Sequence, residues 1–120
     1  MFEGFKVHHA AEQIVQSMKT DFGCNADSLG VAESVLKSDA MRNQVRALKK
    51  NEGISISEGF CVVIETLLSQ SEETPDGLKR IYCVMLAASA RVNGTLDTSV
   101  APIDHIRQLY EINGLGDVPE

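Results

Sequence analysis

The sequence predicts an all-α fold, a bundle of about six short amphipathic helices in a single domain that spans residues 1–120. Apolar residues recur at three- and four-residue spacings along most of the chain, which is the period of a helical face. Residues that favour helix starts and helix ends stand at the borders of these segments. No segment shows the sustained two-residue alternation, bounded by turn residues, that is typical of a strand.

Three of the predicted helices lie in the first half of the chain. The first covers residues 2–18, and its apolar side chains fall on one face. The second is short and begins near Asp27. The third covers residues 40–50, with Ser38 or Asp39 as the residue that caps its start. Gly53 is predicted to end it, because glycine readily takes the left-handed conformation that closes a helix.

Two further helices are predicted to form the centre of the core. The first of them covers residues 56–69, and Ser55 with Glu58 three residues later fits a capping box at its start. Its apolar residues surround it almost completely, which indicates a central position. The second begins at Thr74-Pro75, read as a cap followed by proline in the first helical position. We expect residues 60–68 and 81–88 to pack against each other.

A last helix is predicted to begin at Pro102 and to end at Asn113-Gly114. Its inward face is expected to hold Ile103, Ile106, Leu109 and Tyr110. Residues 115–120 are expected to form a frayed tail. Because no apolar run approaches the roughly 20 residues that cross a bilayer, no membrane insertion is expected.

Charge and cysteine content narrow the class of protein. The formal net charge is −6, which argues against nucleic acid as the expected partner because phosphate binding requires a basic surface. Cys24, Cys61 and Cys83 are odd in number and show no paired spacing, which is typical of reduced packing residues in a cytoplasmic protein. Only Cys24, in a loop, is expected to be exposed.

Two stretches, residues 45–68 and 85–110, share one layout of apolar helix, polar residue before glycine, short loop and second apolar helix. This layout is open to two interpretations, a duplicated helix-loop-helix or two unrelated helix pairs that both use a glycine cap. Residues 86–97, with the sequence LAASARVNGTLD, resemble the tellurite-resistance TerB-like helical domain, in which an alanine-rich helix runs into Asp-Gly-x-Val/Ile with a glutamate a few residues later. The resemblance implies a stress-linked interaction role and a metal held by acidic residues at these turns.

The residues that would hold such a metal are Glu52, Glu58, Asn93 and Asp97, provided that the two turns lie side by side. Oxygen ligands of this kind suit Ca²⁺ or Mg²⁺. The chain departs from the family pattern, because Glu52 and Asn93 replace the aspartate before each glycine. The alternative is that Glu58 serves only the helix start and that Asp97 lies in a solvated loop. No other cofactor is expected.

Two sets of residues are candidates for partner binding. Arg42, Arg46, Lys49 and Lys50 fall on one side of the third helix, where they form either a contact surface or an ordinary solvated face. Phe2 and Phe5 form an apolar start of the chain that a monomer covers poorly. These residues indicate a protein partner or self-association as a homodimer, and the basic side also allows weak binding of an anion or a nucleic acid.

Motifs of known reactions are missing from the sequence. There is no Gly-x-Ser-x-Gly, no phosphate-binding loop and no dinucleotide-binding glycine pattern. His8, His9 and Glu12 would form a metal or acid–base site with His105 only if distant helix ends met; otherwise they are surface or packing residues. The sequence therefore predicts a non-enzymatic helical interaction module, with a divalent-metal-binding domain as the first alternative and an anion or nucleic-acid binder as the second.

Overall fold

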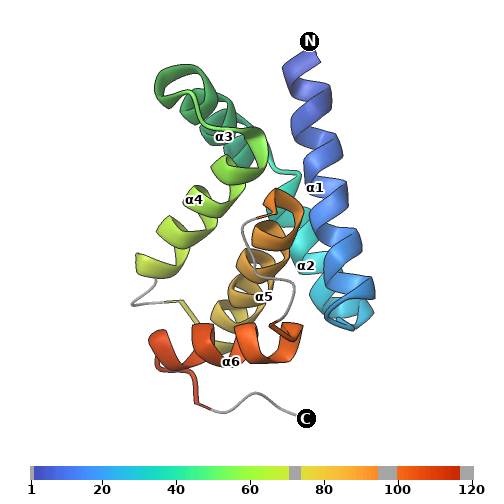
Figure 1. Ribbon diagram of the computed structural model, residues 1–120, viewed down its shortest axis with the longest axis vertical. Helices are drawn as coiled ribbons and strands as arrows, with labels where there is room; N and C mark the ends of the chain where they lie inside the picture. Colours follow the sequence, from blue (N-terminus) through green and yellow to red (C-terminus); the bar gives the residue numbers. More distant parts are fainter. Residues whose placement is uncertain (1, 71–73, 95–99, 117–120) are drawn as a thin grey trace.

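Six α-helices and no strand make up the regular structure of the described residues, which confirms the predicted all-α fold. The computed structural model describes residues 2–70, 74–94 and 100–116, and of residues 2–5 it describes the backbone alone (Figure 1). In chain order the helices are α1 (Phe2–Thr20), α2 (Ala26–Leu36), α3 (Asp39–Glu52), α4 (Ile56–Ser69), α5 (Asp76–Asn93) and α6 (Pro102–Ile112).

Helix α5 occupies the middle of the bundle (Figure 1). Its most extensive contact is with α4, and α1 packs against it as well. Helix α3 covers α4, α2 fills the space beside α1 and α5, and α6 lies across one end of α5. Among the described residues, one continuous core contains buried side chains from all six helices. Phe60 and Ile64 of α4 and Met85 and Ala88 of α5 belong to it, as the predicted central pair requires.

Local side-chain chemistry starts three of the helices. The side chain of Asn25 accepts a hydrogen bond from the backbone N–H of Ser28, Ser38 Oγ accepts one from Met41, and Ser55 Oγ accepts one from Glu58. Each bond satisfies a backbone donor that the first turn of a helix leaves without a partner. Gly53 ends α3 with a φ of 70°. The predicted starts at Ser38 and Ser55 and the predicted end at Gly53 are thus confirmed.

Three details of the predicted helices and tail are wrong. Helix α5 begins at Asp76, so Pro75 and not Thr74 takes the capping position, where no side chain caps the first turn. Ile103 of α6 is 40% exposed and does not face the core. Leu115, expected in a frayed tail, is only 5% exposed, and its backbone N–H donates to the carbonyl of Tyr110. Residues 117–120 of that expected tail lie outside the described residues.

None of the described helices is both long and apolar enough to cross a bilayer. The thiol of Cys24 is partly covered, contrary to the expectation of an exposed thiol, and this burial raises its pKa.

Candidate functional site

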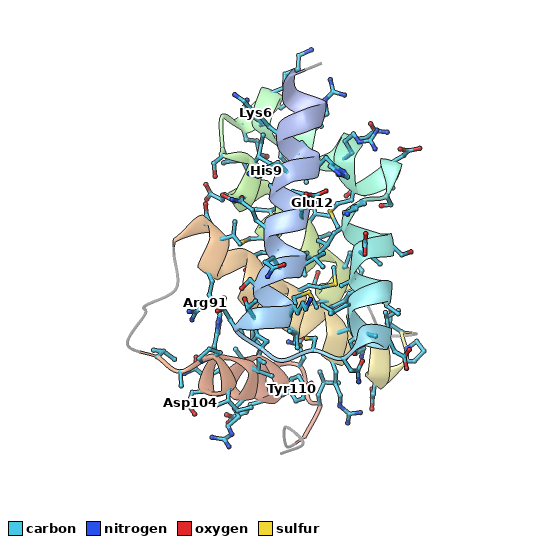
Figure 2. All side chains as sticks on the ribbon, turned by 90° about the vertical axis from the view of Figure 1, so that its right-hand side faces the viewer. Lys6, His9, Glu12, Arg91, Asp104 and Tyr110 are labelled. Carbon is cyan, nitrogen blue, oxygen red and sulfur yellow. The ribbon has the colours of Figure 1, made fainter. Side chains whose placement is uncertain are left out.

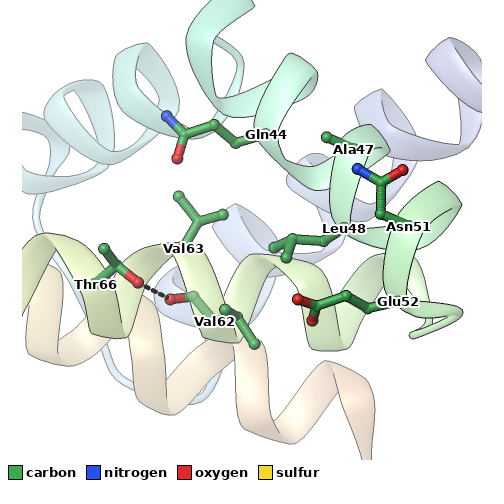
Figure 3. Close-up of a pocket in the computed structure, with 8 residues that line it drawn as sticks. All are labelled: Gln44, Ala47, Leu48, Asn51, Glu52, Val62, Val63 and Thr66. Carbon is green, nitrogen blue, oxygen red and sulfur yellow. Dashed lines mark hydrogen bonds between the residues drawn. The ribbon is translucent and has the colours of Figure 1, made fainter.

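A groove of about 290 Å³ runs between α3 and α4 on the surface of the molecule (Figure 3). Its apolar part is formed by Ala47 and Leu48 of α3 with Val62 and Val63 of α4. Polar side chains line the same groove and can form hydrogen bonds with a bound molecule: Gln44, Asn51, Glu52 and Thr66. Apolar surface surrounded by donors and acceptors is the usual composition of a protein or ligand contact.

The close packing of α3 on α4 places the two walls of this groove. Gly59 lies beside Val45, and a Cβ atom added at Gly59 would stand 3.1 Å from Val45 Cγ1 and 3.6 Å from the Val45 carbonyl oxygen. Glycine therefore permits a backbone approach that a larger residue would hinder. Val45 faces the core, whereas Gln44, Ala47 and Asn51 recur at three- and four-residue spacing along the neighbouring flank of α3.

The predicted basic side of α3 lies on the opposite flank from the groove, as the 3.6-residue period of the helix requires. Arg42 is already paired, with its Nη1 3.4 Å from Asp39 Oδ1. Arg46 and Lys49 are partly buried, and each interacts with other groups of the molecule. Lys50 is exposed. Of the other predicted contact residues, the side chains of Phe2 and Phe5 lie outside the described residues.

The two turns of the predicted metal site do meet. Ser57 Oγ donates a hydrogen bond to Asn93 Oδ1 at 2.7 Å, and Ser55 Oγ donates to the same oxygen at 3.2 Å. The oxygen that Asn93 would offer a metal is thus engaged by two hydroxyl groups. Glu52 and Glu58 are exposed, and Asp97 lies outside the described residues. Among the residues whose placement is given, no three His, Cys, Asp or Glu side chains lie close enough together to hold a metal ion.

The histidines fall into two separate groups. His8 pairs with Glu12, with 2.8 Å between His8 Nε2 and Glu12 Oε1. His105 instead lies near Arg91, which pairs with Asp21 at the opposite end of α1. Figure 2 shows these two regions at different heights of the bundle. Since His8 and Asp21 are separated by about 20 Å along the helix axis, the structure does not bring the histidines together.

His105 occupies a partly buried position at the start of α6. Its Nδ1 atom is covered and has no hydrogen-bond partner within the described part of the chain. Burial, and secondly the charge of Arg91, lower the pKa of His105, because both disfavour the protonated imidazole. The neutral ring is therefore the stable form in the folded protein near neutral pH.

Sequence reasoning missed this groove and also a second hollow that described residues line. Leu48 of α3 and Val62 of α4 follow the apolar spacing of their helices, and this spacing does not indicate a gap between two helices. A second cavity, of about 250 Å³, lies where the end of α1 and the start of α2 meet α5 and α6, and Arg80 lines it. No spacing pattern in the sequence marks Arg80 as different from a surface arginine.

Comparison of the chain with protein families, with characterised proteins and with solved structures finds no match. The resemblance to the TerB-like domain accordingly stays a prediction based on residues 86–97.

Proposed function

We propose that this chain is a non-enzymatic helical module that binds another protein through the groove between α3 and α4. The observation that supports it most directly is the composition of the groove, in which Leu48, Val62 and Val63 are surrounded by hydrogen-bonding side chains. Apolar anchors in a desolvated centre with a polar rim supply most of the binding energy in protein interfaces.

The shape of the groove favours an amphipathic helix as the bound element. Two helices form its walls, and a third helix can lay apolar side chains between them at three- and four-residue spacing. Leu48 and Val62 are only partly buried, so apolar surface remains for a partner to cover. A partner that covered this surface would remove it from water. The complex would then gain about 25 cal/mol of binding free energy per Å² of apolar area buried.

Charge indicates which residues such a helix would carry. Glu52 is the one charged side chain that lines the groove, and it lies in the last turn of α3, where the helix dipole is negative. The basic residues of α3 lie on its other flank. We therefore expect the partner helix to place a lysine or arginine near Glu52 and its apolar residues along Leu48 and Val62.

The chemistry of the groove supports binding rather than catalysis. Thr66 is the one hydroxyl group among its lining residues, and it already donates a hydrogen bond of 2.9 Å to the carbonyl of Val62 in its own helix. A nucleophilic hydroxyl must give its proton to a neighbouring general base, whereas the Thr66 hydroxyl donates its proton to a backbone carbonyl. The side chains that line the groove thus offer contacts but no activated nucleophile.

A pair of matched variants tests the proposal. Ala47→Asp places a charge at the groove, and Ala26→Asp places the same charge at an exposed site in the first turn of α2, where it is compatible with the helix. The full chain and both variants would each serve as bait in a lysate of the cells that make the chain. Each protein that they enrich would then be purified and titrated directly with the chain and with both variants. We expect a direct partner whose affinity falls at least about tenfold with Ala47→Asp and stays unchanged with Ala26→Asp. Equal loss or equal retention with the two variants would contradict the assignment of the groove.

A further inference from the structure

The cavity around Arg80 differs from the groove in its chemistry. Apolar side chains of Met18, Ile81 and Val84 form much of its wall, and Ser28, Arg80 and Tyr110 add polar groups. These residues come from α1, α2, α5 and α6, so the cavity forms only when four helices have packed. An apolar cavity with a few converging polar groups is the usual composition of a small-molecule site.

Arg80 lines this cavity, and no described residue gives it a negatively charged partner. Its Nη2 donates to the backbone carbonyl of Leu115 at 3.3 Å, and its Nε is covered and has no hydrogen-bond partner among the described residues. Three other arginines, Arg42, Arg91 and Arg107, each pair with an aspartate. Within the described ranges, no carboxylate forms an ion pair with Arg80, although the chain carries a net charge of −6. A partly buried guanidinium that lacks a negative partner lowers the stability of the folded protein. An anion that paired with it would restore that stability.

The surrounding backbone also favours an anion. Ser28 lies in the first turn of α2 and Gly77 in the first turn of α5, and both residues line the cavity. The start of α5 has no side-chain cap. Helix starts carry partial positive charge, which favours a bound negative group, and this holds at α2 even though the N–H of Ser28 itself already donates to Asn25 Oδ1. Asp27 and Asp76, the acidic residues of these two turns, are exposed and are not among the lining residues.

From these observations we infer that the cavity binds a small organic carboxylate, with its carboxylate on Arg80 and its apolar body against Met18, Ile81 and Val84. The guanidinium carries five N–H donors, and those that Leu115 does not engage can donate to the carboxylate oxygens of the ligand. A cavity of about 250 Å³ has room for roughly eight groups the size of water. Hexanoate, with a carboxylate and a short apolar chain, has the size and chemistry that the cavity requires.

The inference does not depend on the proposed protein partner, because the cavity and the groove have no lining residue in common. It is tested by titrating the full chain with hexanoate and following the amide signals of Ser28 and Gly77 by NMR. Hexan-1-ol, which keeps the chain and lacks the charge, and inorganic phosphate, which keeps a charge and lacks the chain, are the comparison probes. We expect saturable shifts with hexanoate, and binding at least about tenfold weaker with either comparison probe.

Variants assign the binding to the cavity. Arg80→Met should weaken hexanoate binding by about tenfold or more, whereas Arg107→Met, at an exposed arginine of α6, should leave it unchanged. Gly77→Leu should fill the cavity mouth without strain, because a Cβ atom there meets nothing within 4 Å. Gly30→Leu is its control, since it adds the same side chain to an exposed and equally open site of α2.

The inference is overturned if hexanoate gives no saturable shift up to about 20 mM, a concentration that would reveal even weak binding. It is equally overturned if hexan-1-ol binds as tightly as hexanoate, or if Gly77→Leu and Gly30→Leu bind hexanoate alike. The glycine pair decides the question even if Arg80→Met does not fold.

Discussion

Replacing Gly59 by alanine tests the close contact that places α3 against α4. In an ordinary helix interior, glycine to alanine stabilises the fold by about 0.5–1 kcal/mol, because alanine loses less backbone entropy on folding. Gly30 of α2 is such a site, since a Cβ atom there meets nothing within 4 Å. We therefore expect Gly30→Ala to raise the free energy of unfolding by about that amount.

Gly59→Ala should behave differently because its new Cβ atom would stand only 3.1 Å from Val45 Cγ1. Carbon atoms attract best at about 3.5–4.0 Å, so Val45 must move by about half an ångström. Val45 is completely buried and β-branched, which leaves it little freedom to move. Overpacking of this kind costs about 1–3 kcal/mol and cancels or exceeds the gain in helix propensity.

The measurement is urea unfolding of both variants and the parent chain, followed by circular dichroism. The free energy of unfolding of Gly59→Ala should lie about 1–3 kcal/mol below that of Gly30→Ala, which corresponds to roughly 4–12 °C in melting temperature for a chain of this size. Equal stabilisation by the two substitutions would refute the reasoning, because it would mean that α3 and α4 do not approach closely at Gly59.

The other predictions concern the core, a titrating side chain and the turns. Ile64→Ala should lower the free energy of unfolding by about 2–5 kcal/mol, whereas Ile112→Ala, at a residue 79% exposed, should change it by less than about 0.5 kcal/mol in urea unfolding. Because the pKa of His105 is lower in the folded than in the unfolded protein, His105 should reduce stability as pH falls below about 6.5, and His105→Asn should remove that part of the pH dependence. Calorimetric titration with Ca²⁺, Mg²⁺, Mn²⁺ or Zn²⁺ should give no binding heat, because Asn93 Oδ1 is engaged by two hydroxyl groups; a saturable heat that Glu58→Gln abolishes would contradict this.

Most helix borders were predictable because the interactions that set them are local. Ser38 and Ser55 bond to backbone groups three residues away, and Gly53 closes α3 through its own conformation. The error at Thr74-Pro75 has the same origin. Proline is compatible both with the capping position and with the first helical position, so the residue type does not decide between them.

Features that depend on contacts between distant helices were not predictable in the same way. Leu115 is ordered by its neighbours Tyr110 and Arg80, and the latter is 35 residues away. Ile103 follows the apolar spacing of α6, but among the described helices only α5 approaches α6 closely along the backbone, so a narrower face is covered. The groove and the cavity around Arg80 also depend on contacts between distant helices. The apolar spacing of a helix shows which of its faces is apolar, but it does not show how far apart two such faces lie.

A photo-crosslink from the groove tests the central proposal most directly. The chain would carry p-benzoylphenylalanine at Ala47, or at Ala26 as a control, and would be irradiated in its native cells. If a partner helix occupies the groove, the crosslink from Ala47 joins the chain to an apolar and basic helical segment of a second protein, and Ala26 does not produce it. A crosslink to that protein from Ala26 and none from Ala47 would contradict the account.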